Sequence, residues 1–189
     1  MKTFVISLVM LLGSIASFAQ PKLAPLDTSP LDISYFPENY PLLRIQQKVT
    51  QPPVARVIYS RPQKNNRSIF GGLIEYGKVW RLGANEASEV EFFQNVKINN
   101  VKVKKGRYTL YAIPNLTTWT MILNKENDIW GSYAYDAKKD IVRMDVPALK
   151  QTDISEAFGM VFEKTTNGGF NLSALWDDVK VSLPVSLQP

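Results

Sequence analysis

Apolar and polar residues alternate with a period of two along most of the chain beyond residue 42. The alternation is plain over residues 89–92, 108–113 and 158–163. Because successive side chains of a strand point to opposite faces, each of these segments predicts a strand with one buried face. No window shows the period of about 3.6 residues that is typical of an amphipathic helix. The pattern therefore predicts an all-β domain.

Turn residues divide this pattern into short strands. Asn99-Asn100 predicts a tight hairpin because Asn tolerates positive φ, and Gly168-Gly169 predicts another turn. Short strands with turns about every 8–12 residues are typical of a single-domain antiparallel β-sandwich, jelly-roll-like or a flattened barrel, with little or no helix. The expected strands, about ten in all, are 43–49, 54–59, 89–92, the two arms of 96–103, 108–113, 119–123, 141–146, 158–163, 170–176 and 179–183.

The first residues have the pattern of a targeting segment. Lys2 supplies a positive start, Phe4–Leu12 is apolar, and Ser17-Phe18-Ala19 places small residues at the two positions that a signal peptidase reads. The apolar run is shorter than the ~18–20 residues that span a bilayer, and no stop-transfer pattern follows it. We therefore expect residues 1–19 to be a signal peptide, cleaved between Ala19 and Gln20, rather than a membrane anchor. The protein is then exported, to the periplasm or outside the cell, with no transmembrane segment.

Residues 20–41 contain five prolines and no periodic pattern. Because proline removes a backbone donor and disfavours regular ladders, this segment predicts a Pro-rich extended arm ahead of a β-sandwich domain at 42–189. Its apolar residues can pin the arm to the domain surface; they are Leu31, Ile33, Tyr35 and Phe36.

Composition excludes several classes of chemistry. The 189 residues include neither Cys nor His, which removes disulfides, thiolate nucleophiles, imidazole bases and the Cys or His ligands of zinc and haem. We expect no cofactor and no metal. Lys and Arg number 22 against 17 Asp and Glu, a net charge of +5. Because these charges are scattered between acids along the sequence, they predict solvated faces rather than a nucleic-acid-binding patch.

The segment Arg61–Glu86 does not fit the strand-and-turn pattern. It reads RPQKNNRSIFGGLIEYGKVWRLGANE, with four glycines and three arginines. It lacks the glycine spacing of phosphate-binding loops. A long connection that contains several glycines inside a compact domain is more often an ordered, functional loop than an irregular linker. We therefore look for function here.

The same residues resemble a known family. The strings Tyr59-Ser60-Arg61-Pro62, Tyr76–Glu86 (YGKVWRLGANE) and Trp130-Gly131 occur in the order and spacing of the domain-of-unknown-function family numbered twenty-nine eleven. The resemblance covers roughly Gln46 to Pro184 and departs from the family at Val103–Lys105, where members often have Leu-Pro-Ala. It implies an exported, single-domain β protein of the kind found mostly in Bacteroidetes. It implies no activity.

Two sets of residues are candidates for a ligand site. Guanidinium groups fork two donors onto a planar anion, so Arg61, Arg67 and Arg81, with Asn85 and Glu86, can bind a carboxylate, phosphate or sugar hydroxyl. The alternative is a structural Arg81–Glu86 ion pair that braces the fold. Four aromatic residues can form a floor for a sugar or can belong to the core: Tyr59, Tyr76, Trp80 and Trp130.

Three functions stay open. The preferred reading is a non-enzymatic module that binds a small polar molecule or envelope glycan at the Arg61–Glu86 segment. The first alternative is a carboxylate-dependent, glycan-directed hydrolase in which Glu86 acts with Glu75, Glu89 or Glu91, although alternation puts the last two on a solvent face. The second alternative is a structural or interaction protein. Trp119 and Trp176 lie in alternating strands and are assigned to packing.

Overall fold

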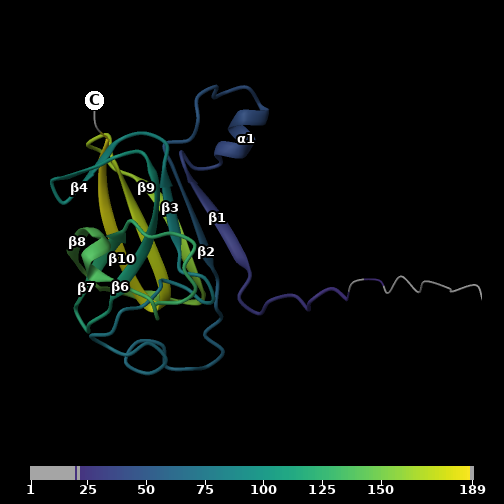
Figure 1. Ribbon diagram of the computed structural model, residues 1–189, viewed down its shortest axis with the longest axis vertical. Coiled ribbons are helices and arrows are strands. Elements are labelled where there is room, and N and C mark those ends of the chain that lie inside the picture. Colours follow the sequence, from purple (N-terminus) through teal and green to yellow (C-terminus); the bar gives the residue numbers. More distant parts are fainter. Residues whose placement is uncertain (1–19, 21, 188–189) are drawn as a thin grey trace, which may run out of the picture.

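The computed structural model describes residue 20 and residues 22–187, which form two antiparallel sheets packed face to face (Figure 1). The expected signal peptide, residues 1–19, lies outside the described residues. Among the helices described, none has the length and apolar character needed to cross a bilayer. The elements are β1 (Leu31–Phe36), α1 (Tyr40–Ile45), β2 (Ala55–Ser60), β3 (Glu89–Phe92), β4 (Val96–Ile98), β5 (Val101–Val103), β6 (Gly106–Ile113), β7 (Thr118–Asn124), the 3-10 turn η1 (Ala137–Lys139), β8 (Asp140–Pro147), β9 (Leu149–Lys164) and β10 (Phe170–Leu187).

The ten described strands divide unequally between the two sheets. Six follow the order β1-β2-β3-β6-β7-β8, and four follow the order β5-β4-β10-β9. Every named pairing is antiparallel, and neither sheet closes into a barrel. The predicted all-β sandwich is therefore confirmed, with α1 and η1 as its short helical segments.

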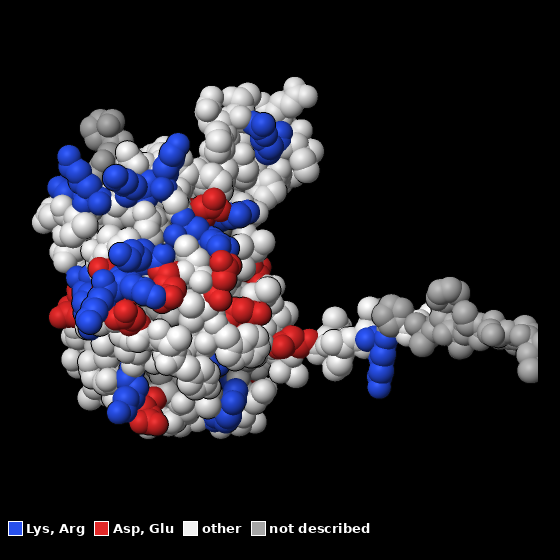
Figure 2. Space-filling model, viewed as in Figure 1, with Lys and Arg blue, Asp and Glu red and all other residues white. Residues whose placement is uncertain are grey.

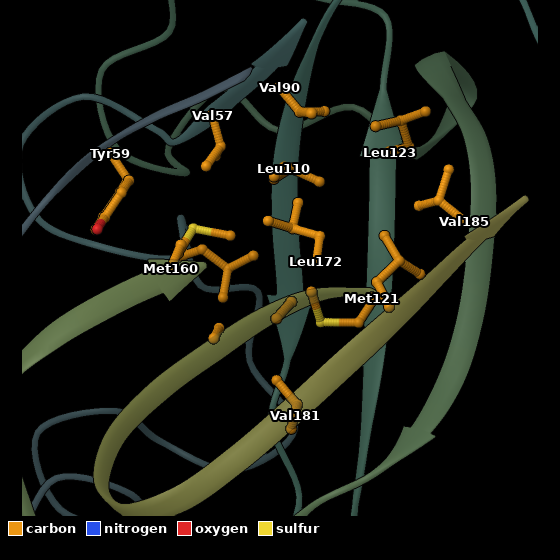
Figure 3. Close-up of a cluster of buried hydrophobic side chains, with 14 of the residues drawn as sticks. Val57, Tyr59, Val90, Leu110, Met121, Leu123, Met160, Leu172, Val181 and Val185 are labelled. Carbon is orange, nitrogen blue, oxygen red and sulfur yellow. The ribbon is translucent and has the colours of Figure 1, made fainter. Parts of the chain in front are cut away.

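The core lies between the sheets, and in β2, β3 and β4 alternate side chains enter it, as the alternation predicts. In β2, Ala55 and Val57 are fully buried and Tyr59 is 4% exposed, and the facing β10 contributes Phe170 and Leu172. Figure 3 shows how side chains from β2, β3, β6 and β7 meet those from β9 and β10. Because the chain holds no Cys, no disulfide stabilises this core, and burial of its apolar side chains is the main stabilising contribution.

Two predictions near the amino-terminal side of the domain are wrong. Residues 43–49 form no strand; α1 covers Tyr40–Ile45, with Pro41 in its first turn and no buried residue. The apolar residues of this segment do not pack into the core, so their alternate spacing does not correspond to a buried face of a strand. Residues 31–36, expected within an extended arm, instead form β1, which pairs with β2 from Leu31↔Ser60 to Phe36↔Ala55.

β10 bends sharply near its middle. Asp177 has φ 53° and lies between two register shifts in the pairing with β9. The hydroxyls of Ser173 and Ser182 are 2.8 Å apart, so the two halves of β10 lie side by side. The two strands expected at 170–176 and 179–183 are thus the halves of one element that folds back (Figure 3).

Candidate functional site

The Arg61–Glu86 segment covers one end of the sandwich, opposite to α1 and the β4–β5 hairpin (Figure 1). Its first residues cross from β2 to β9: Phe158 N donates to Pro62 O at 2.9 Å, and Lys64 N donates to Glu156 O at 2.7 Å. Its end is tied to β6, because Trp80 and Ala112 exchange two backbone hydrogen bonds of 2.7 and 2.9 Å. The segment is therefore built into both sheets.

A hollow of about 340 Å³ opens beneath this segment. Arg67 and Arg81 contribute its cationic side chains, and Trp176 forms part of its floor. The remaining lining is Thr28, Ser29, Pro62, Gln63, Asn65, Leu73, Ile74, Gly83 and Ala84. We call this hollow the arginine pocket. Two of the three candidate arginines meet there, together with amide and hydroxyl groups suited to a polar ligand.

Arg81 is the residue of the pocket whose hydrogen bonding is incomplete. Its side chain is half-buried, and its Nε is shielded from solvent without a hydrogen-bond partner. The structural alternative paired this guanidinium with Glu86, but no such ion pair occurs within residues 22–187, and Glu86 is exposed. A buried guanidinium donor without an acceptor loses its hydration without compensation.

Arg67 and Arg61 are held by the protein. Arg67 donates from Nε to Lys64 O at 3.0 Å and from Nη2 to Gln63 O at 2.5 Å, which fixes the rim of the pocket. Arg61 pairs with Asp32 at 3.0 Å and donates from Nε to Phe158 O at 3.2 Å. Since these bonds tie β1, β2 and β9 together, Arg61 belongs to the framework and does not line the pocket.

The aromatic residues do not form one floor. Tyr59 and Trp80 are each only 4% exposed, so these two rings belong to the core. Trp80 donates from its indole N–H to Gly83 O at 3.1 Å and packs among the rings of Phe70, Trp119, Phe158 and Trp176. Trp119 and Trp176 are buried, as expected for packing residues.

Tyr76 and Trp130 are exposed, by 39% and 60%, and lie apart from the arginine pocket. The ring of Tyr76 packs over Gly71, where a Cβ would stand only 2.7 Å from a ring carbon. Trp130 forms an isolated backbone bridge with Glu86. The four aromatic residues therefore do not form a shared floor for a ligand.

Glu86 contributes to a different hollow, of about 150 Å³, on the outer face of the six-stranded sheet. Glu89 and Asp128 also line it, and Arg107 binds both, Glu89 at 3.3 Å and Asp128 at 2.7 Å. The hydrogen bond with Asp128, followed by the charge of Glu89, raises the pKa of Arg107. Glu89 lies on the face away from the core, as the alternation predicts, but neighbouring side chains cover it and leave its side chain only 14% exposed.

Residues of the arm complete the arginine pocket, and these were not among the predicted site residues. Asp27 accepts a hydrogen bond from Asn85 Nδ2 at 3.0 Å and another from Ser29 N at 2.6 Å. Thr28 and Ser29 thereby lie along one wall. Asn85 has φ 57°, a conformation that Asn tolerates. Its hydrogen bond with Asp27 holds the arm against the segment. No local pattern marks this contact because 58 residues separate its partners.

The candidate residues are thus distributed over the core, the framework and two hollows. No curated protein and no solved structure matches the chain significantly. A family model matches residues 41–185, which spans α1 to most of β10 and leaves β1 outside. The WRLGANE string that carries the resemblance lies within this range. The chain belongs to the family described as Protein of unknown function (DUF2911).

Proposed function

We propose that this protein is an exported binding module that holds a small anionic ligand, a sugar acid or organic acid, in the arginine pocket. The single observation that carries the proposal is that Arg81 lines a 340 Å³ hollow while its Nε is buried without a hydrogen-bond partner. A carboxylate that accepts from Nε and a second guanidinium nitrogen forms the bidentate pair for which Arg is suited.

The rest of the lining supports a ligand that carries hydroxyl groups. Gln63 and Asn65 bring side-chain amides, and Thr28 and Ser29 bring hydroxyls. Amides and hydroxyls both donate and accept hydrogen bonds, as recognition of a sugar requires. The pocket volume lies near the lower end of the range for small-molecule sites, about 300–1,000 Å³. A monosaccharide acid fits this combination better than an extended polymer does.

The hydrolase alternative has weaker support. Glu89 and Asp128 are both bound to Arg107, so neither is a free partner for Glu86 in the acidic hollow. Glu91 is paired with Arg56 at 2.8 Å. Glycoside hydrolysis needs two available carboxyl groups on either side of the bond. The structural alternative accounts for Arg61 and Arg67 but gives Arg81 no partner.

Isothermal titration with D-glucuronate, D-galacturonate and citrate, with D-glucose as the neutral control, tests this function. We expect saturable binding of at least one acid and none of glucose. Arg81→Gln should weaken that binding at least tenfold, since a lost charge-assisted hydrogen bond costs about 1.5–3 kcal/mol. Lys102→Gln, which removes one charge at the opposite end, should leave it unchanged.

Two outcomes would contradict the proposal. One is an absence of binding to all three acids by the wild-type chain. The other is equal weakening by Arg81→Gln and Lys102→Gln, which would show a nonspecific charge effect. Release of reducing sugar from oligosaccharides, abolished by Glu86→Gln, would instead establish the hydrolase.

A further inference from the structure

The β4–β5 hairpin concentrates lysines that the sequence had suggested were dispersed. Lys97, Lys102, Lys104 and Lys105 are all exposed, and none forms an ion pair within the part of the chain that the structure describes. In Figure 2, blue side chains gather at the end of the molecule where β4 lies, and the acidic ones lie mostly below. The expectation of scattered charge is therefore wrong for this hairpin.

Two of these lysines oppose each other directly. The register pairs Lys97 with Lys102, while the flanking Val96–Val103 pair turns inward. Like charges in opposite positions of an antiparallel pair destabilise the sheet. Lysine on an edge strand protects it from edge-to-edge association, which accounts for Lys102 on the edge strand β5. It does not account for Lys97, since β4 is an inner strand.

Apolar side chains are exposed at the same end of the molecule. α1 carries Leu42 and Ile45, three residues apart and 54% and 80% exposed, and Val101 on the hairpin is 38% exposed. α1 and the β4–β5 hairpin both project from the end that lies away from the arginine pocket (Figure 1). This end thus combines ammonium groups with apolar side chains.

We infer that this end of the domain docks on the surface of an anionic phospholipid bilayer. Lysines near such a surface are attracted by its negative potential, and exposed Leu and Ile side chains can enter the boundary between headgroups and acyl chains. The basic side chains of the hairpin are lysines, which act as point charges and do not impose the planar fork of Arg. The hairpin residues 96–105 also include no aromatic ring on which a base could stack. These features favour a broad anionic surface over a nucleic acid.

The orientation that follows is compatible with ligand binding. With the hairpin and α1 against the bilayer, the arginine pocket at the other end faces the aqueous phase (Figure 1). The inference concerns different residues from the proposed function, so either can fail alone.

Co-sedimentation of the full chain with vesicles tests the inference. Vesicles of phosphatidylglycerol and phosphatidylcholine are compared with pure phosphatidylcholine vesicles, which measure any charge-independent contribution of Phe4–Leu12. We expect binding to the anionic vesicles that falls as NaCl is raised. Lys97→Gln with Lys102→Gln should weaken it about 25-fold, at about fivefold for each lysine. Leu42→Ser with Ile45→Ser should weaken it at every salt concentration.

The matched control is Lys125→Gln with Lys138→Gln, which removes the same charge from exposed lysines of the 125–139 loop. This variant should bind within about twofold of wild type. Equal binding to both vesicle types, or equal loss in the two double variants, would overturn the inference. So would binding of duplex DNA, but not vesicles, that depends on Lys97 and Lys102. Self-association of the hairpin variant without vesicle binding by wild type would assign the lysines to edge protection alone.

Discussion

The two ends of this sandwich use their positive charges in opposite ways. At the end covered by Arg61–Glu86, the guanidinium groups of Arg61 and Arg67 are bound to backbone carbonyls or to Asp32, whereas the Nε of Arg81 is buried without a partner among the described residues. At the end formed by α1 and the β4–β5 hairpin, the ammonium groups are exposed and unpaired in the described structure. A fixed donor in a hollow suits one ligand of defined shape, whereas free charges on a projection suit an extended surface.

The difference arises from how each end is attached to the core. Trp80 anchors the pocket end by packing among four other rings, and its indole N–H donates to the carbonyl of Gly83. The hairpin end contributes Val96, Ile98 and Val103 to the core, and its other side chains project into solvent. The two ends therefore differ mainly in how firmly their side chains are attached to the core, because both carry positive charge.

The largest effect is expected from Trp80→Ala. Removing a buried aromatic ring from the core should lower the free energy of unfolding by about 3–5 kcal/mol. Trp130→Ala, at an exposed ring, should change it by no more than about 0.5 kcal/mol. Denaturant unfolding of both variants measures the contrast, and similar losses would show that the pocket end does not rest on the core as described.

Gly83→Ala should have the next largest effect. This residue has φ 150°, and a Cβ would stand 3.1 Å from Ser60 O, so alanine would strain the segment by about 1–3 kcal/mol. Gly77→Ala is the control: it has φ 74° but nothing within 4 Å of a Cβ, and it should lose less. If Gly77→Ala proves the more destabilising, close packing beneath Gly83 is not what fixes the pocket wall.

Acid should weaken the strand pairing of β9 and β10 through Glu163. Burial alone would raise the pKa of Glu163, but the hydrogen bonds from Lys180 and Ser173 and the charge of Lys180 lower it overall. A carboxyl whose pKa is lowered in the folded state stabilises that state above its unfolded pKa, near 4.5. This stabilisation should disappear as the pH falls from about 4.5 through the folded value.

Thermal melts of wild type and Glu163→Gln across this range check the sign. The difference in melting temperature between them should shrink on acidification, because Gln has no proton to bind. A constant difference from neutral to acid pH would rule out the contribution of the ionised Glu163.

The smallest effect is expected at the hairpin. Lys102→Gln relieves its repulsion with Lys97 and should raise the free energy of unfolding by about 0.2–1 kcal/mol. Lys138→Gln, at an exposed lysine outside the hairpin, should be neutral. No change in Lys102→Gln would mean that the cross-strand repulsion is already screened, and a loss of stability would show that Lys102 stabilises the hairpin instead.

Much of the fold could be predicted because most strands and turns are marked by residue patterns that are local in the sequence. The 96–103 hairpin follows from two asparagines, with φ 46° and 63°, between alternating segments. The local pattern does not predict β1 because its paired residues in β2 lie 19 to 29 positions further along the chain and prolines flank it. The pattern does not predict α1 because the apolar residues at 43 and 45 have the spacing of one face of a strand. Neither of them is buried in the structure.

The site was predictable only in part. Arg67 and Arg81 line one hollow, and the sequence already places both in one glycine-rich segment. The burial of Tyr59 and Trp80 depends on rings contributed by β7, β9 and β10, which a local pattern does not reveal. The wall formed by Thr28 and Ser29 depends on the distant contact between Asp27 and Asn85.

The most direct test of the central claim observes the Arg81 Nε–H group itself. In a protein labelled with nitrogen-15, its resonance is assigned by its absence from Arg81→Lys and is followed during titration with D-glucuronate, D-galacturonate and citrate. We predict a saturable shift of this resonance with at least one acid, none with D-glucose, and little change in the Arg61 Nε–H that donates to Phe158. An Arg81 resonance that stays fixed while any of these acids binds would contradict the account.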